Sequence, residues 1–183
     1  SLAATQSYNA AAVNDAPSGA ATAALAAGTE DTVYTVSAVD LLAGFSDVEV
    51  DILSVSGLSV DHGTVSANAD GTYTVTPAPN VNGALTLSYN VTDGTDSVAA
   101  TQTYNVAAVN DAPIGTATGV LAAGTEDTPY SVSAATLLAG FSDVDGDTLS
   151  VSGLGANHGT VAANADGTYT ITPTQNYNGA MTL

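Results

Sequence analysis

The chain has 183 residues and 18 acidic side chains but no lysine or arginine, so its formal net charge at pH 7 is −18. No salt bridge to a permanent side-chain cation can form within it, and nucleic acid or an anionic membrane surface is a poor partner for so acidic a protein. The absence of cysteine excludes disulfides and cysteine-based metal sites.

No apolar run approaches the roughly 20 residues that a membrane-spanning helix needs, so no direct membrane insertion is expected. The N-terminal residues do not form a signal-peptide pattern, and we interpret the chain as a soluble internal piece of a longer protein.

An internal repeat organises the chain. Residues 1–87 align without a gap on residues 97–183, with 64 of the 87 pairs identical. A period of 96 residues is the size of a domain, which favours an array of modules that each bury their own core. The motif VNDAP, at 13–17 and 109–113, is the predicted linker. We expect 1–17 to be the last strand and linker of a preceding repeat, 18–113 a complete repeat, and 114–183 a repeat without its last strands.

The predicted elements of the complete repeat are mostly short strands. In chain order, residues 37–44 (SAVDLLAG) could form a helical turn, and strands are expected at 53–55, around Val65, at 72–76, at 84–92 and at 98–109. The segment 84–92 (ALTLSYNVT) alternates apolar and polar residues, and Asp70-Gly71 before 72–76 is a hairpin signal. About seven short strands in roughly a hundred residues, these five among them, predict an all-β fold of tandem antiparallel Greek-key β-sandwiches, cadherin- or immunoglobulin-like.

The second repeat lacks the counterpart of residues 88–113. We therefore expect 114–183 to be completed by a strand from another molecule, for which segment 1–17 is the candidate because it is equivalent to the lost last strand. That strand would lie beside Ala180–Leu183.

Several motifs together resemble a known family. They are GTEDT (28–32 and 124–128), VTDGTDS (91–97), SDVDGDTLSV (142–151), ADGTYTITP (165–173), YNGAMTL (177–183) and VNDAP. The set is similar to the bacterial cadherin-like tandem repeats of very large RTX-type surface adhesins. This resemblance implies cadherin-like sandwiches, calcium at the junctions between modules, type I secretion and a spacer role in a filamentous adhesin at the cell surface.

The acidic loop of the second repeat is the main candidate for cation binding. Asp143, Asp145 and Asp147 alternate around Gly146. Calcium takes six to eight oxygen ligands, and a glycine permits the tight curvature that such a loop needs. The spacing is not that of an EF-hand. The alternative is a solvated turn in which aspartates accept hydrogen bonds from backbone N–H groups.

The resemblance also implies how ligands are shared. In the cadherin arrangement, a junction ion takes an acid from the preceding module, Asn and Asp from the linker, and acids from the following module. Carried onto this chain, the internal junction would use Glu30, Asn110, Asp111, Asp143, Asp145 and Asp147. The upstream junction would use Asn14, Asp15, Asp47, Glu49, Asp51 and Asp93. For Asp31, Asp96 and Asp127, assistance and a plain surface role stay equally open.

The first repeat departs from this pattern. Its loop reads DVEVD at 47–51, so that Glu49 and Val50 replace an aspartate and the glycine. We expect this loop to be less tightly curved and its site weaker or altered.

No constellation of catalytic residues is present, so the chain is not expected to be an enzyme. His62 and His158 occur once per repeat before a glycine and are interpreted as turn residues. The leading hypothesis is a calcium-stiffened spacer that projects a distant binding domain. The alternative is that the repeats themselves bind carbohydrate or a cell surface, which would call for an exposed aromatic cluster.

Overall fold

The computed structural model describes residues 3–183 and divides the chain into two compact units, which we call unit 1 (Ser1–Val109) and unit 2 (Asn110–Leu183). The division falls inside the second VNDAP motif. Among the described residues, no helix is both long enough and apolar enough to cross a bilayer. Each unit is built of short, mostly antiparallel strands and a single helical turn.

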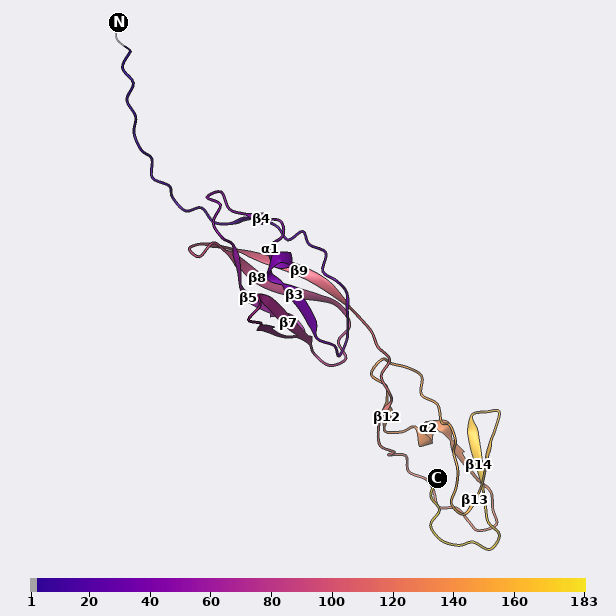
Figure 1. The fold of residues 1–183 in the computed structure, drawn as a ribbon. Helices are drawn as coiled ribbons and strands as arrows, with labels where there is room; N and C mark the ends of the chain where they lie inside the picture. The colour runs from indigo at the N-terminus through magenta and orange to yellow at the C-terminus, as the bar shows by residue number, and fades with distance from the viewer. Residues whose placement is uncertain (1–2) are drawn as a thin grey trace. The chain divides into compact units, whose positions relative to one another are not determined.

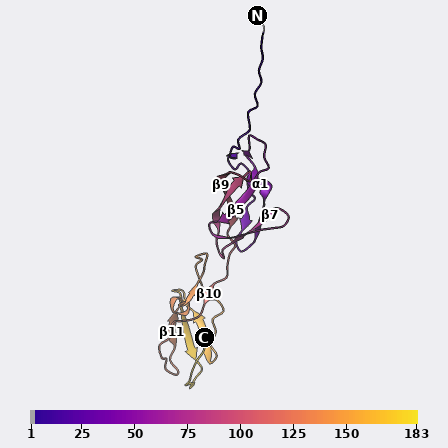
Figure 2. The same ribbon diagram turned by 90° about the vertical axis from the view of Figure 1, so that its left-hand side faces the viewer.

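Unit 1 is a two-sheet sandwich (Figures 1 and 2). Its elements are β1 (Ser18–Gly19), β2 (Gly28–Thr29), β3 (Tyr34–Ser37), α1 (Ala38–Leu42), β4 (Phe45–Ser46), β5 (Ser54–Val60), β6 (Gly63–Ala67), β7 (Thr72–Pro77), β8 (Gly83–Thr92) and β9 (Ser97–Ala107). One sheet has the order β2-β9-β8-β5 and the other β3-β7-β6, while β1 pairs with β4. The connections from β3 to β5 and from β7 to β8 pass from one sheet to the other. The topology is therefore the predicted Greek key.

The core of unit 1 follows the alternation predicted for β8. Leu85, Leu87, Tyr89 and Val91 are each at most 3% exposed, and they pack with residues of the facing sheet and α1. The Tyr89 hydroxyl donates to the carbonyl oxygen of Leu41 at 2.8 Å, so the one large polar group on this face has a partner. Burial raises the pKa of Tyr89 above its ordinary value.

The hairpin β6–β7 confirms the turn predicted at Asp70-Gly71. The carboxylate of Asp70 accepts from the Thr72 hydroxyl at 2.7 Å and from the Thr72 N–H at 3.0 Å. These hydrogen bonds lower the pKa of Asp70. Gly71 has φ +82°, a conformation that glycine adopts without strain.

Unit 2 forms only one sheet of such a sandwich. Its elements are β10 (Ile114–Gly115), β11 (Tyr130–Ser133), α2 (Ala134–Leu137), β12 (Phe141–Ser142), β13 (Gly159–Ala163) and β14 (Thr168–Pro173). The sheet β11-β14-β13 corresponds strand for strand to β3-β7-β6, and β10 pairs with β12 as β1 does with β4.

The sequence SVSGL occurs in both units but is a strand only in unit 1. At 54–58 it belongs to β5, whose partner in the sheet is β8. At 150–154 it lies in no strand, because the counterpart of β8 is present only as Gly179–Leu183, which is also outside any strand. A backbone cannot hold a sheet conformation by propensity alone when no neighbouring strand accepts its hydrogen bonds.

Candidate metal centres

The acidic loop of unit 1 is a tight turn organised by Asp47. One carboxylate oxygen, Oδ1, accepts from the N–H of Glu49 at 2.9 Å and from the N–H of Asp51 at 3.4 Å. The other, Oδ2, is buried and has no hydrogen-bond partner among the residues that the structure describes. A buried carboxylate oxygen without a donor is costly, and a bound cation would compensate it.

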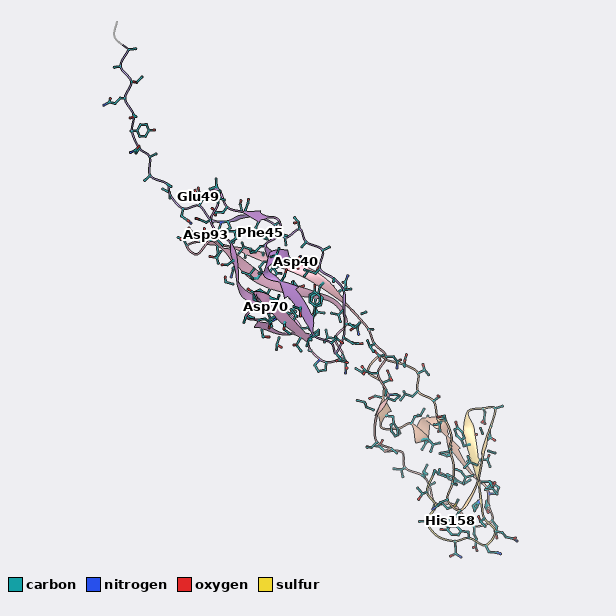
Figure 3. The ribbon with its side chains drawn as sticks, viewed as in Figure 1. Asp40, Phe45, Glu49, Asp70, Asp93 and His158 are labelled. Carbon is teal, nitrogen blue, oxygen red and sulfur yellow. The ribbon has the colours of Figure 1, made fainter. Side chains whose placement is uncertain are left out.

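The linker of unit 1 is hydrogen-bonded both to this loop and to the turn between β8 and β9. The Asn14 amide donates to Asp93 Oδ2 at 3.1 Å and to Asp96 Oδ2 at 3.0 Å. The Asp15 N–H donates to Glu49 Oε2 at 3.2 Å. Figure 3 shows Glu49 and Asp93 at the same end of the sandwich. We call the set Asn14, Asp15, Asp47, Glu49, Asp51, Asp93 and Asp96 the unit 1 cluster. It contains all six residues that the family resemblance assigned to the upstream junction.

Asp96 was left open by the sequence, and its hydrogen bond from Asn14 places it in the unit 1 cluster. Asp93 closes the turn between β8 and β9, since its Oδ1 accepts from the N–H groups of Thr95 and Asp96 at 2.6 and 2.7 Å. Those two bonds lower the pKa of Asp93, so the carboxylate stays charged at neutral pH.

Unit 2 repeats the loop geometry. Asp143 Oδ1 accepts from the N–H groups of Asp145 at 3.0 Å and Asp147 at 3.3 Å, and the Asp111 N–H donates to Asp145 Oδ2 at 2.7 Å. The Asn110 amide donates to the carbonyl oxygen of Asp111 at 2.9 Å. The structure thus brings together the five residues predicted from the linker and loop of this repeat, which we call the unit 2 cluster.

The expectation of a looser loop in the first repeat is wrong. Val50 has φ +66° and Gly146 has φ +78°, so both loops make the same left-handed turn. The hydrogen bonds from the loop N–H groups to Asp47 hold Val50 in that conformation, although a β-branched residue is strained there. The substitution therefore changes the strain of the turn and leaves its curvature unchanged.

Glu30 lies after β2 and is 2% exposed. Its Oε1 accepts from the Val109 N–H at 2.5 Å and its Oε2 from the Asn82 amide at 3.1 Å, while its own N–H donates to the Ala107 carbonyl oxygen. The parallel pairing of β2 with β9 produces this arrangement. Its role as a metal ligand stays a prediction. Sequence reasoning missed Asn82, although its retention as Asn178 in the second repeat was a signal.

The remaining candidates cap loops of their own units. Asp31 accepts from the Asn80 N–H at 3.1 Å, and Asp127 accepts from the Asn176 N–H at 2.8 Å. Their geometry fits the surface alternative. His62 lies 3.4 Å from Asp61, and His158 stacks on Tyr177 with ring centroids 4.1 Å apart.

The donor sets fit a hard divalent cation. Each cluster offers carboxylate and amide oxygens, the ligands that calcium takes, and the chain has no lysine or arginine that could neutralise them. The acidic clusters could therefore hold a metal such as Ca²⁺. A bound cation would stabilise Asp47 Oδ2 in particular, because this oxygen is buried without a hydrogen-bond donor among the described residues.

A Greek-key sandwich of two sheets, in which an early strand, β2, runs parallel to the last strand, β9, is immunoglobulin-like. The family described as "Cadherin-like domain" matches residues 13–107 and again 109–183. The chain belongs to this family and carries two of its domains in tandem.

No curated protein matches the chain. Among solved structures, it is similar to the endo-fucoidan hydrolase MfFcnA4 from glycoside hydrolase family 107, with 20% identity, TM-score 0.41, and coverage of 87% of this chain and 24% of that one. It is also similar to the endo-fucoidan hydrolase MfFcnA9 of the same family, with 21% identity, TM-score 0.34, and coverage of 86% and 29%. The chain thus spans about a quarter of the length of these enzymes, and a likeness at this level carries no argument about activity.

Proposed function

We propose that the chain is a non-catalytic, calcium-stiffened spacer from a bacterial surface adhesin of the RTX type, secreted and displayed outside the cell, where it projects a distal binding domain. The observation that carries the calcium part is the unit 1 cluster. Hydrogen bonds join the linker there to the acidic loop and to the turn between β8 and β9, and the loop holds a carboxylate oxygen, Asp47 Oδ2, that is buried without a donor among the described residues. The spacer part rests on the cadherin-like family and on the near-identity of the two repeats.

In this proposal, Asp47, Glu49, Asp51 and Asp93 supply the negative oxygens and the linker residues complete the set. When bound, calcium supplies the positive charge that the chain itself lacks. Since Asn14 and Asp15 belong to the linker and the others to the folded sandwich, a shared ion would tie the linker to the domain and reduce its freedom. Glu30 does not belong to this set, because the family resemblance assigns it to the internal junction.

Calcium also offers a reason for the timing of folding. A net charge of −18 opposes compaction, and this opposition is strongest when no divalent cation is present. A chain secreted unfolded would then bind calcium only outside the cell, where the ion stabilises the folded state by mass action.

The alternative, direct binding of carbohydrate by the repeats, receives less support from the structure. In unit 1, Tyr89 and Tyr104 are core residues, and Tyr34 and Tyr73 pack against that core. A glycan array on the chain tests this alternative, and we expect no binding.

The central experiment compares Asp47→Asn with Asp40→Asn in chelator and in saturating calcium. Both variants remove one charge, but Asp40 lies in the first turn of α1, away from Glu49 and Asp93 (Figure 3). Calcium at 100 times its dissociation constant should stabilise the parent by about 2.7 kcal/mol. Asp40→Asn should keep this gain in melting temperature and Asp47→Asn should lose most of it.

In chelator we expect the effect of Asp47→Asn on stability to have the opposite sign. The amide introduced by Asp47→Asn would keep an oxygen for the N–H groups of Glu49 and Asp51 and would replace the unpaired charged oxygen by a neutral donor. This variant should therefore be at least as stable as the parent when calcium is absent. A parent melting temperature that does not change with calcium would remove the calcium half of the proposal. X-ray scattering with and without chelator tests the other half, since a spacer should lose extension when the ion is removed.

A further inference from the structure

An exposed Asn-Gly pair stands at the start of β8 in unit 1. Asn82 is exposed in the loop between β7 and β8, and Gly83 is the first residue of β8. Among the asparagines of the chain, only Asn82 and Asn178 are followed by glycine, and the two occupy equivalent positions of the repeats. Each unit therefore has one asparagine whose next residue carries no side chain.

The backbone nitrogen of Gly83 is open to react with the Asn82 side chain. Apart from the chain neighbours of Gly83, no heavy atom lies within 4 Å of the place where its Cβ would stand. The Gly83 nitrogen can add to the Cγ carbon of Asn82, after which the bond from Cγ to Nδ2 breaks and Nδ2 leaves with the Gly83 proton as ammonia. Water then opens the resulting cyclic imide at one of its two carbonyl carbons, which leaves aspartate or isoaspartate in place of Asn82.

The amide that this reaction removes has a specific partner in the fold. Asn82 Nδ2 donates to Glu30 Oε2 at 3.1 Å, while Glu30 Oε1 accepts from the Val109 N–H at 2.5 Å. Glu30 is 2% exposed, so water has little access to replace a lost donor. The chain has no lysine or arginine that could take the place of the amide. The pairing of Glu30 therefore depends on an amide at residue 82.

We propose that Asn82 is a site of spontaneous deamidation, with Gly83 and water as the reactants, and that the product converts the Asn82–Glu30 hydrogen bond into a repulsive pair of carboxylates. An ionised carboxylate accepts hydrogen bonds but donates none, and each of two neighbouring carboxylates disfavours ionisation of the other. Isoaspartate carries the same charge and also adds a methylene group to the main chain just before the pairing of Gly83 with Val106. Unit 1 thus loses stability as the molecule ages.

The first experiment follows the reaction in the parent chain at mildly alkaline pH, where the Gly83 nitrogen loses its proton more readily. Chelator is present throughout, so the outcome does not depend on calcium and leaves the proposed function untouched. Cleavage after aromatic residues and leucine gives a peptide, 74–85, that holds both Asn80 and Asn82. Tandem mass spectrometry of this peptide should show loss of the amide at Asn82, and enzymatic methylation should detect isoaspartate there.

Asn80 is the internal reference for the rate. It is exposed in the same loop, but the next residue is Val81, whose side chain hinders attack by the backbone nitrogen. Asn80 should keep its amide long after Asn82 has lost it. A free peptide of residues 78–85 is the positive control for the conditions. If this peptide reacts and Asn82 in the folded chain does not, or if Asn80 and Asn82 react at the same rate, the proposed site is wrong.

The consequence for stability is measured by urea unfolding in chelator. Asn82→Asp should raise the equilibrium constant for unfolding at least about tenfold, because it removes a hydrogen bond to a charged group. Asn105→Asp makes the same change of charge at an exposed position of β9 and should have little effect. The aged parent gives an independent measure: the fraction that has gained negative charge, separated by anion exchange, should unfold at lower urea than the unreacted fraction.

A double variant tests whether Glu30 causes the loss. Glu30→Gln together with Asn82→Asp restores a pair of one carboxylate and one amide with their positions exchanged. The double variant should therefore recover most of the stability that Asn82→Asp loses, a coupling that the comparison with both single variants measures. Losses that simply add would show that the Glu30 contact is not responsible, and aged and unreacted fractions of equal stability would likewise overturn this part of the proposal.

Discussion

Val50 provides a direct test of how the acidic loop is built. The residue occupies the left-handed conformation, φ +66°, at the position where the second repeat has Gly146. Its side chain is 85% exposed, so replacing it removes almost no buried apolar surface. Val50→Gly therefore changes almost only the contribution of the backbone conformation to the free energy of unfolding.

The expected magnitude follows from two opposing terms. A non-glycine residue in the left-handed region costs about 1–2 kcal/mol, and the β-branched side chain of Val50 places it at the upper end. Glycine in turn lowers the free energy of unfolding by about 0.5–1 kcal/mol, because it gives the unfolded chain more conformational freedom. The net expectation is that Val50→Gly stabilises unit 1 by about 1–1.5 kcal/mol, which corresponds to a rise of roughly 4–12 °C in melting temperature.

The assay is urea unfolding in chelator, followed by the near-ultraviolet circular dichroism of the tyrosines. Val48→Gly is the matched control, because Val48 is also exposed, at 73%, but lies outside the left-handed region. It should destabilise by about 0.5–1 kcal/mol, opposite in sign to Val50→Gly. A Val50→Gly variant that is less stable than the parent would contradict the conclusion that Val50 is strained in this turn.

Two further predictions concern packing and pH. Leu87→Ala should cost about 2–5 kcal/mol, because Leu87 is fully buried in β8, whereas Leu183→Ala, at the equivalent partly buried position outside any strand, should cost less than half as much in the same urea assay. Asp70 has a pKa below the ordinary 3.8, so the stability from its hydrogen bonds is present above that pH and is lost as the pH falls through the folded-state pKa. The difference in stability between the parent and Asp70→Ala should therefore be constant near neutral pH and shrink below about pH 4; a difference that grows on acidification would contradict the assignment.

Much of the candidate site could be read from the sequence because its parts are local. Asp143, Asp145 and Asp147 are two residues apart, and the turn they form depends on hydrogen bonds within five residues. The convergence of Asn14 with Asp93 was expected only through the family resemblance, since no local rule joins residues 79 positions apart. The inclusion of Asp96, and the partnership of Glu30 with Asn82, needed the folded sandwich.

Local sequence was enough to predict the two modules, the strands with clear alternation such as β8, the hairpin turn at Asp70-Gly71, and the excess of carboxylates with no side-chain cation. These features depend on side-chain period, turn chemistry and charge, which are properties of neighbouring residues. The folded structure was needed to show that SVSGL is a strand at 54–58 and not at 150–154, and that Val50 takes a conformation suited to glycine. A strand needs hydrogen-bonding partners from distant segments, and a strained turn needs surrounding bonds that hold it, so identical or similar local sequences reach different outcomes when those partners differ.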